Sequence, residues 1–214
     1  MGPPRNMKRV PLERAPEPRF ILICEGGKTE PHYFDALRAH FGWRIALIYE
    51  RGAGDPMMVA EKAVKRAREE GLYQKSVKGA KVQAKADQVW AIFDRDTHGR
   101  FEEAIRLCEQ SGVRVGRSIP CFELWLLLHL DDFDKQHDHN QVQAHLEKMR
   151  PEYDASRAKT VHSAELVPQV EVAEGRALRQ LADRIATGNP LGRPSTTVGH
   201  LTRAMREAAA KSSL

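Results

Sequence analysis

The sequence predicts an α/β protein built on a parallel sheet. Short continuous apolar runs, typical of strands covered on both faces, alternate with segments whose apolar residues recur at helical spacing. The alternation extends over residues 20–133, and beyond it the pattern is mostly helical. We therefore expect right-handed crossovers between parallel strands in 20–133, and a helical extension over 134–214 packed on that core.

Each expected element follows from a local pattern. Apolar residues at helical spacing follow the first three strands, and Pro31 and Pro120 suit first helical turns because proline lacks the N–H that is unused there. The helix after Pro120 is expected to be buried, since PCFELWLLLHL is apolar on nearly every side. The expected strands are 20–25, 45–49, 89–93 and 113–119, and the expected helices of the extension are 140–149, 169–186 and 197–211.

The composition is that of an ordinary globular protein, with 41% hydrophobic and 29% charged residues in 214. No apolar run approaches the roughly 20 residues of a membrane span, and residues 1–19 lack the apolar stretch of a secretory signal. We therefore expect a cytoplasmic protein with no membrane partner. Three cysteines in apolar surroundings are expected to be reduced core thiols rather than disulfides or zinc ligands: Cys24, Cys108 and Cys121.

Two segments are strongly basic. Residues 1–19 combine five basic residues with prolines and are expected to form a flexible arm, while residues 72–86 hold four lysines and no acid, as expected of a mobile loop. Both are candidates for holding a nucleic-acid backbone with a salt-dependent affinity, or are simply solubilising. The net charge of +5 agrees with either interpretation.

Three acids stand where expected strands end. Glu25 ends the first strand, and Asp94 and Asp96 follow the third. Ligands of open α/β sheets bind outside the carboxyl ends of the strands. Carboxylates about 4 Å apart repel by roughly 4 kcal/mol at an effective dielectric near 20, so such a cluster needs a proton or a cation. Singly, each acid is more simply a strand-end or capping residue; together they favour a Mg²⁺ or Mn²⁺ site.

Other polar residues have competing interpretations. Glu123 lies in an apolar helix, where it is expected to meet a metal, an arginine or backbone donors, and we favour a site-facing role. Lys28 is a candidate phosphate contact or an ordinary solvated lysine. His98 is a candidate proton shuttle or an exposed loop residue. The segment HDHNQVQAH, with His137, His139 and His145, lacks the pairing of zinc proteases and is expected to be a loop entering a helix.

The segment GGKT looks like the end of a Walker A loop. That motif requires a glycine where this chain has Leu22, so an NTPase is excluded.

The segments ICEGGKTE and FDRD together resemble the Toprim signature of primases, topoisomerases and some nucleases, a Glu after the first strand and a DxD after a later one. More closely, residues from about 19 to 206 resemble the RloB-like family of restriction-linked and phage-defence proteins. The segments that carry this resemblance are CEGGKTEPHYF, RGAGDP, VWAIFDRDTH, IPCFELWLLLHL and a weaker PSTTVGHL. The segment TGNPLGRP departs from the expected pattern, so no role is assigned to 195–200.

The resemblance implies a Toprim-like, Rossmann-like parallel sheet flanked by helices, and a metal-dependent nuclease role. Glu25 would then act as general base or acid, Asp94 and Asp96 would bind the metal, and Glu30 would hold another metal or simply begin a helix. The candidate catalytic residues are thus Glu25, Lys28, Asp94, Asp96 and Glu123, and the candidate ligands of Mg²⁺ or Mn²⁺ are Glu25, Glu30, Asp94 and Asp96.

The leading functional hypothesis is hydrolysis of a phosphodiester bond of DNA or RNA in anti-phage defence. The alternative is a non-catalytic regulatory subunit that binds nucleic acid, a metal-nucleotide or another component of a defence system. A third possibility is an assembly subunit that uses the helical extension, as in a homodimer.

Overall fold

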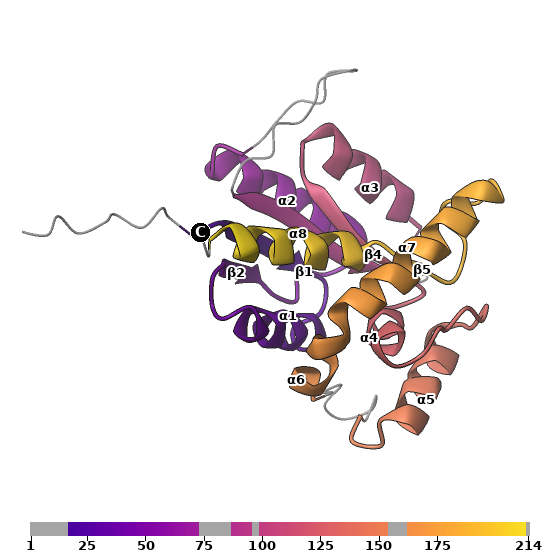
Figure 1. Ribbon diagram of the computed structural model, residues 1–214. Coiled ribbons are helices and arrows are strands. Elements are labelled where there is room, and N and C mark those ends of the chain that lie inside the picture. The colour runs from indigo at the N-terminus through magenta and orange to yellow at the C-terminus, as the bar shows by residue number, and fades with distance from the viewer. Residues whose placement is uncertain (1–16, 73–86, 96–98, 154–161, 213–214) are drawn as a thin grey trace, which may run out of the picture.

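A computed structural model describes residues 17–72, 87–95, 99–153 and 162–212. Its sheet has the strand order β2-β1-β3-β4-β5 (Figure 1). The first four strands run parallel, and β5 is a short antiparallel addition next to β4. Their bounds are β1 Arg19–Cys24, β2 Ala46–Glu50, β3 Gln88–Asp94, β4 Arg114–Ile119 and β5 Ser195–Thr196. The predicted α/β class, Rossmann-like with C-terminal helices, is confirmed.

Helices cover both faces of the sheet. Helices α2 and α3 lie on one face, while α1, α4, α7 and α8 lie on the other (Figure 1). The bounds are α1 Thr29–His40, α2 Pro56–Glu69, α3 Phe101–Gln110, α4 Glu123–Leu130, α5 His139–Met149, α6 Ser163–Leu166, α7 Val170–Ala186 and α8 Val198–Lys211, with a 3-10 turn, η1, at Val167–Gln169. Among the described residues no helix is long and apolar enough to cross a membrane.

Strand β1 shows why the strands are apolar at every position. Phe20 and Leu22 pack in the core on the α1 and α8 side, whereas Ile21 and Ile23 pack in the core on the α2 side. Successive side chains of a strand point to opposite faces, so a strand with helices on both sides needs apolar residues throughout. The three cysteines are free and buried, as predicted.

The C-terminal part of the chain contributes to the sheet, which the helical pattern did not predict. Ser195 pairs with Ile119 and Thr196 with Ser118, and the Thr196 and Ser118 hydroxyls lie 3.1 Å apart. A strand of two residues is too short to produce a periodic pattern, because it is held by its partner strand rather than by its own composition. Helix α8 follows directly and packs on the sheet (Figure 1).

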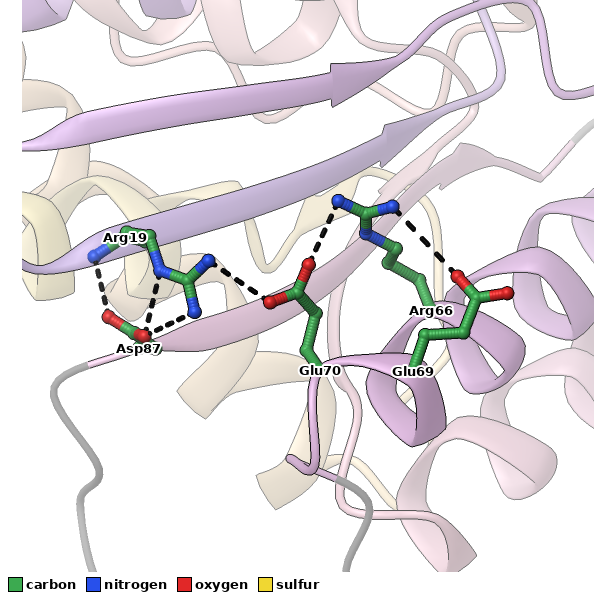
Figure 2. A network of polar contacts seen from close by, with 5 residues as sticks. All are labelled: Arg19, Arg66, Glu69, Glu70 and Asp87. Atoms are coloured by element: carbon green, nitrogen blue, oxygen red, sulfur yellow. Dashed lines mark hydrogen bonds and ion pairs between the residues drawn. The ribbon is translucent and has the colours of Figure 1, made fainter.

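At the edge where the parallel strands begin, hereafter the amino edge, charged side chains form a chain of ion pairs (Figure 2). Arg19 lies 2.7 Å from Asp87 and 3.0 Å from Glu70, and Arg66 lies 2.9 Å from Glu70. The sequence pattern placed Arg19 in the basic arm, but it is the first residue of β1 and its guanidinium is held by acids. Residues 1–16 and 73–86, which hold most of the predicted basic arm and loop, lie outside the described residues.

Candidate functional site

At the opposite edge, where the parallel strands end, hereafter the carboxyl edge, Glu25 and Asp94 are directly connected. Glu25 follows β1, and its Oε2 accepts a hydrogen bond from the backbone N–H of Asp94 at 2.9 Å. Asp94 is the last residue of β3, and its Oδ2 accepts from the backbone N–H of Phe122 at 3.0 Å. The ends of two adjacent strands and the start of α4 are therefore joined through carboxylates, as the strand-end positions predicted.

The turn between β1 and α1 folds the Glu30 carboxylate back over Gly26. Glu30 is buried in the first turn of α1, and its Oε1 accepts from the backbone N–H of Gly26 at 3.1 Å. A Cβ at position 26 would lie 2.4 Å from Glu30 Oε2, far inside van der Waals contact, whereas a Cβ at Gly27 would meet nothing within 4 Å. A side chain at position 26 would therefore displace the Glu30 carboxylate, whereas position 27 has room for one.

Glu123 begins α4 and is 4% exposed. Its Oε1 accepts hydrogen bonds from the hydroxyl of Tyr153 at 2.7 Å and from Gln143 Nε2 at 3.3 Å. The sequence pattern required partners for this buried carboxylate and proposed a metal, an arginine or backbone donors. The structure instead supplies two neutral side chains, one from α5 and one from the segment after it.

Asp94 is in an electrostatically unfavourable position. Burial raises the pKa of its carboxyl well above the ordinary value, and the nearby carboxylates of Glu30, Glu123 and Glu25 raise it further, in that order. The hydrogen bond from Phe122 acts in the opposite direction and is the smallest of these influences. The other three carboxylates therefore all disfavour the charged form of Asp94, a condition that a proton or a cation relieves.

Two buried thiols border the same cluster. Burial raises the pKa of Cys24 well above its usual range, and the Glu30 carboxylate adds to the effect. Burial also raises the pKa of Cys121, with Glu123 and Asp94 adding to it. Both thiols are therefore protonated near neutral pH and act as apolar lining rather than as nucleophiles.

The other predicted site residues lie in different settings. Lys28 is exposed at the start of α1, next to the turn that carries Glu30. Asp96 and His98 lie outside the described residues. His137 and His145 contact the Phe133 ring, and His139 is the first residue of α5, so these histidines are where the loop-to-helix interpretation placed them.

Within the described part of the chain, no three His, Cys, Asp or Glu side chains are arranged to hold a metal ion. The predicted metal set also includes Asp96, whose position is not described. The donor chemistry of Glu25, Glu30 and Asp94 is that of a hard divalent ion, because all the donors are carboxylate oxygens. The repulsion that nearby carboxylates exert on Asp94 also agrees with a bound cation at this place. Mg²⁺ or Mn²⁺ therefore stays a prediction.

Two arginines follow strands at the carboxyl edge. Arg51 follows β2, where it lies 3.8 Å from Asp35 and over the ring of Tyr49. Arg95 follows β3 and donates to the backbone oxygen of Leu191 at 2.8 Å. Both are exposed. Sequence reasoning did not select either one, since a single arginine after a strand carries no distinctive pattern.

Fold and site together define a Rossmann-like α/β protein with a partly buried group of carboxylates at the carboxyl edge of its sheet. The chain belongs to the RloB family, described as RloB-like proteins, whose family model matches residues 20–205. No curated protein and no solved structure matched the chain. The predicted membership is confirmed, and the match spans both the strands that carry the acids and the C-terminal helices.

Proposed function

We propose that this RloB-like protein is a metal-dependent nuclease that hydrolyses phosphodiester bonds of DNA or RNA. The observation that carries the proposal is the position of Asp94, half-buried at the end of β3, where Glu25 accepts a hydrogen bond from its backbone N–H and where the carboxylates of Glu30, Glu123 and Glu25 raise its pKa. Such an arrangement lowers stability unless it has a ligand, and pKa values shifted by burial and like charges are characteristic of functional sites. The family resemblance to restriction-linked and phage-defence proteins extends the proposal to a role in cytoplasmic defence.

Glu25, Glu30, Asp94 and Asp96 are the proposed ligands of Mg²⁺ or Mn²⁺. When bound, such an ion supplies positive charge that stabilises the charge developing on phosphoryl and leaving oxygens. The chain fixes the described ligands before any ion arrives, because the Asp94 and Gly26 N–H groups hold the Glu25 and Glu30 carboxylates. Preorganised carboxylates lose little conformational freedom on binding.

Two acids and three basic side chains have proposed roles in the reaction. Glu25 is the proposed general base or acid, because its carboxylate reaches the end of β3. Glu123 is proposed to face the reacting centre, since its charge acts on Asp94. Lys28, Arg51 and Arg95 are proposed to hold phosphates of the substrate backbone. Cleavage is therefore expected to weaken as salt concentration rises.

A screen of single- and double-stranded DNA and RNA with Mg²⁺ or Mn²⁺ tests the proposal, with EDTA as the metal-free control. Wild-type protein is expected to cut at least one substrate, and Asp94→Asn and Glu25→Gln are expected to abolish cutting while their circular dichroism stays that of wild type. Binding of Mn²⁺ or nucleic acid without cleavage of any substrate would contradict the nuclease and favour the non-catalytic regulatory subunit.

A further inference from the structure

We propose that Tyr153 and Gln143 are positioning residues that fix the Glu123 carboxylate for the chemistry at the carboxyl edge. The inference rests on the proposed function of that edge. It assigns a role in the site to α5 and the segment after it, a part of the chain in which the sequence pattern indicated only helices and polar joints. Neither residue was selected by the motifs of the chain.

The geometry of the contact is specific. The Tyr153 hydroxyl donates to Glu123 Oε1 at 2.7 Å, a well-formed hydrogen bond between a hydroxyl and a carboxylate oxygen. Gln143 Nε2 donates to the same oxygen at 3.3 Å. All three residues are buried, with exposed fractions of 2% for Tyr153, 7% for Gln143 and 4% for Glu123. Two donors that converge on one oxygen restrict the orientation of the carboxylate more than either would alone.

The donors are held by ordered structure. Gln143 lies in α5, and a capping box between Asp138 and Gln141 fixes the start of that helix. After α5 the backbone N–H of Tyr153 donates to the oxygen of Arg150 at 2.9 Å. The Tyr153 ring belongs to the same buried apolar cluster as Cys121 and α4. The hydroxyl position is therefore determined by packing and not by the carboxylate alone.

The contact reaches the reacting centre through Glu123. Glu123 follows Phe122, whose backbone N–H donates to Asp94 Oδ2 at 3.0 Å, so the first residue of α4 stands directly beside the Asp94 carboxylate. If the donors were absent, the buried Glu123 carboxylate would lose these two hydrogen bonds and would reorient to find other partners. That reorientation would alter the charge that Asp94 and a bound cation experience. Residues that orient catalytic carboxylates typically contribute about 10- to 100-fold to metal affinity or activity.

The chain offers a matched control for deletion of the Tyr153 hydroxyl. Tyr33 is also buried in the same cluster, but its hydroxyl pairs with His129 Nε2 at 3.0 Å and not with a site acid. Burial lowers the pKa of His129 to about 4, so its ring is neutral near pH 7 and accepts from Tyr33. Tyr33→Phe thus removes the same group from the same core without touching Glu123.

The test is a double-mutant cycle of Tyr153→Phe and Glu123→Gln, read by Mn²⁺ titration of the full chain and by kcat and KM on the substrate found in the screen. In the wild-type background, Tyr153→Phe is expected to lower kcat or Mn²⁺ affinity by about 10-fold or more. In the Glu123→Gln background it is expected to add less than about 2-fold, because the carboxylate on which it acts is gone. Tyr33→Phe is expected to match wild type in both readouts, and Gln143→Leu to act in the same direction as Tyr153→Phe, but more weakly.

Wild-type kcat, KM and Mn²⁺ affinity in both Tyr153→Phe and Gln143→Leu would overturn the inference. Equal losses on adding Tyr153→Phe to wild type and to Glu123→Gln would also overturn it, because they would mark a general structural effect. If Tyr153→Phe does not fold, Gln143→Leu replaces it in the double-mutant cycle with Glu123→Gln, and the same outcomes test the inference. A wild-type protein that neither binds Mn²⁺ nor cuts any substrate is a different result, which overturns the proposed function itself and this inference with it.

Discussion

The two edges of the sheet differ in how their charged side chains are arranged. At the amino edge acids and bases alternate, since Arg19 lies between Asp87 and Glu70, and Arg66 also contacts Glu70 (Figure 2). At the carboxyl edge, the nearby carboxylates of Glu25, Glu30 and Glu123 all raise the pKa of Asp94. The same strands therefore begin in a compensated network and end in a group of like charges.

The difference separates stability from function. Ion pairs at a partly exposed edge contribute little individually, and the Arg19 side chain is 38% exposed, but in this network each acid has a basic partner. A buried group of carboxylates lowers stability, and proteins retain such groups where a ligand or a reaction needs them. The amino edge is therefore expected to respond to mutation through stability alone, and the carboxyl edge through ligand binding and chemistry.

The largest expected effect is loss of cleavage in Asp94→Asn. The asparagine keeps an oxygen for the Phe122 N–H but removes the charge proposed to bind the ion. We expect kcat/KM to fall by about 10²- to 10⁴-fold. Asp87→Asn, the matched change at the amino edge, is expected to leave kcat/KM at the wild-type value. Equal losses in the two variants, measured on one substrate, would remove the functional difference between the edges.

The next largest expected effect is a loss of Mn²⁺ affinity on substitution of Gly26, in the turn between β1 and α1. Gly26→Ala places a methyl group where the Glu30 carboxylate lies, so that carboxylate must move. We expect Mn²⁺ affinity to fall by about 10- to 100-fold, measured by calorimetric titration. Gly27→Ala, one residue later, meets no atom within 4 Å and is expected to bind Mn²⁺ as wild type does. A wild-type affinity for Gly26→Ala would show that Glu30 is not a ligand.

A smaller effect is the pH dependence of stability in EDTA. The carboxyl of Asp94 has a raised pKa in the folded protein, so the folded state binds its proton more tightly than the unfolded state does. The resulting stabilisation is complete below the ordinary carboxyl pKa and is lost as the pH rises through the folded value. In that pH window, the contribution of Asp94 to the free energy of unfolding falls by up to about 1.4 kcal/mol per pH unit.

Urea unfolding of wild type and Asp94→Asn between pH 4 and pH 8 measures this contribution as the difference between the two proteins. The difference is expected to change with pH in favour of the variant as the pH rises. A difference independent of pH would mean that Asp94 titrates normally, and the carboxyl edge would then lack the predicted repulsion.

The smallest effect belongs to the amino edge. Arg19→Gln removes the guanidinium that bridges Asp87 and Glu70, and the loss in unfolding free energy is expected to be about 1 kcal/mol. The loss should shrink in high salt, because exposed ion pairs are screened. Mn²⁺ affinity should stay unchanged. A shift in Mn²⁺ affinity equal to that of Gly26→Ala would contradict the independence of the two edges.

Sequence reasoning found the acids because their positions follow from local pattern. An apolar run that ends in Glu25, and another that ends in Asp94, place both carboxylates at one sheet edge once the strands are parallel. The need for a partner at Glu123 was also predictable, since it interrupts an apolar helix. In these cases the signal lies within a few residues of the functional group.

The partners could not be found in this way. Tyr153 and Gln143 lie 30 and 20 residues from Glu123, and nothing near them in the sequence marks them as donors. The close approach of Glu30 to Gly26 depends on a side-chain rotamer that no spacing rule encodes. Strand β5 and the pairing of Arg19 with Asp87 likewise depend on which segments meet in the folded chain. Local pattern thus identified the charged groups that are unfavourable to bury. Tertiary contacts determine which partners offset that unfavourable burial.

The most direct test of the account compares the unfolding free energies of Asp94→Asn and Asp87→Asn in EDTA near pH 7. The account predicts opposite signs. Asp94→Asn should be more stable than wild type by about 0.5 to 2 kcal/mol, because it removes a repelled carboxylate. Asp87→Asn should be less stable by about 1 kcal/mol, because it weakens the contact with Arg19. Destabilisation of similar size by both substitutions would contradict the claim that the carboxyl edge is held in an unfavourable state for function.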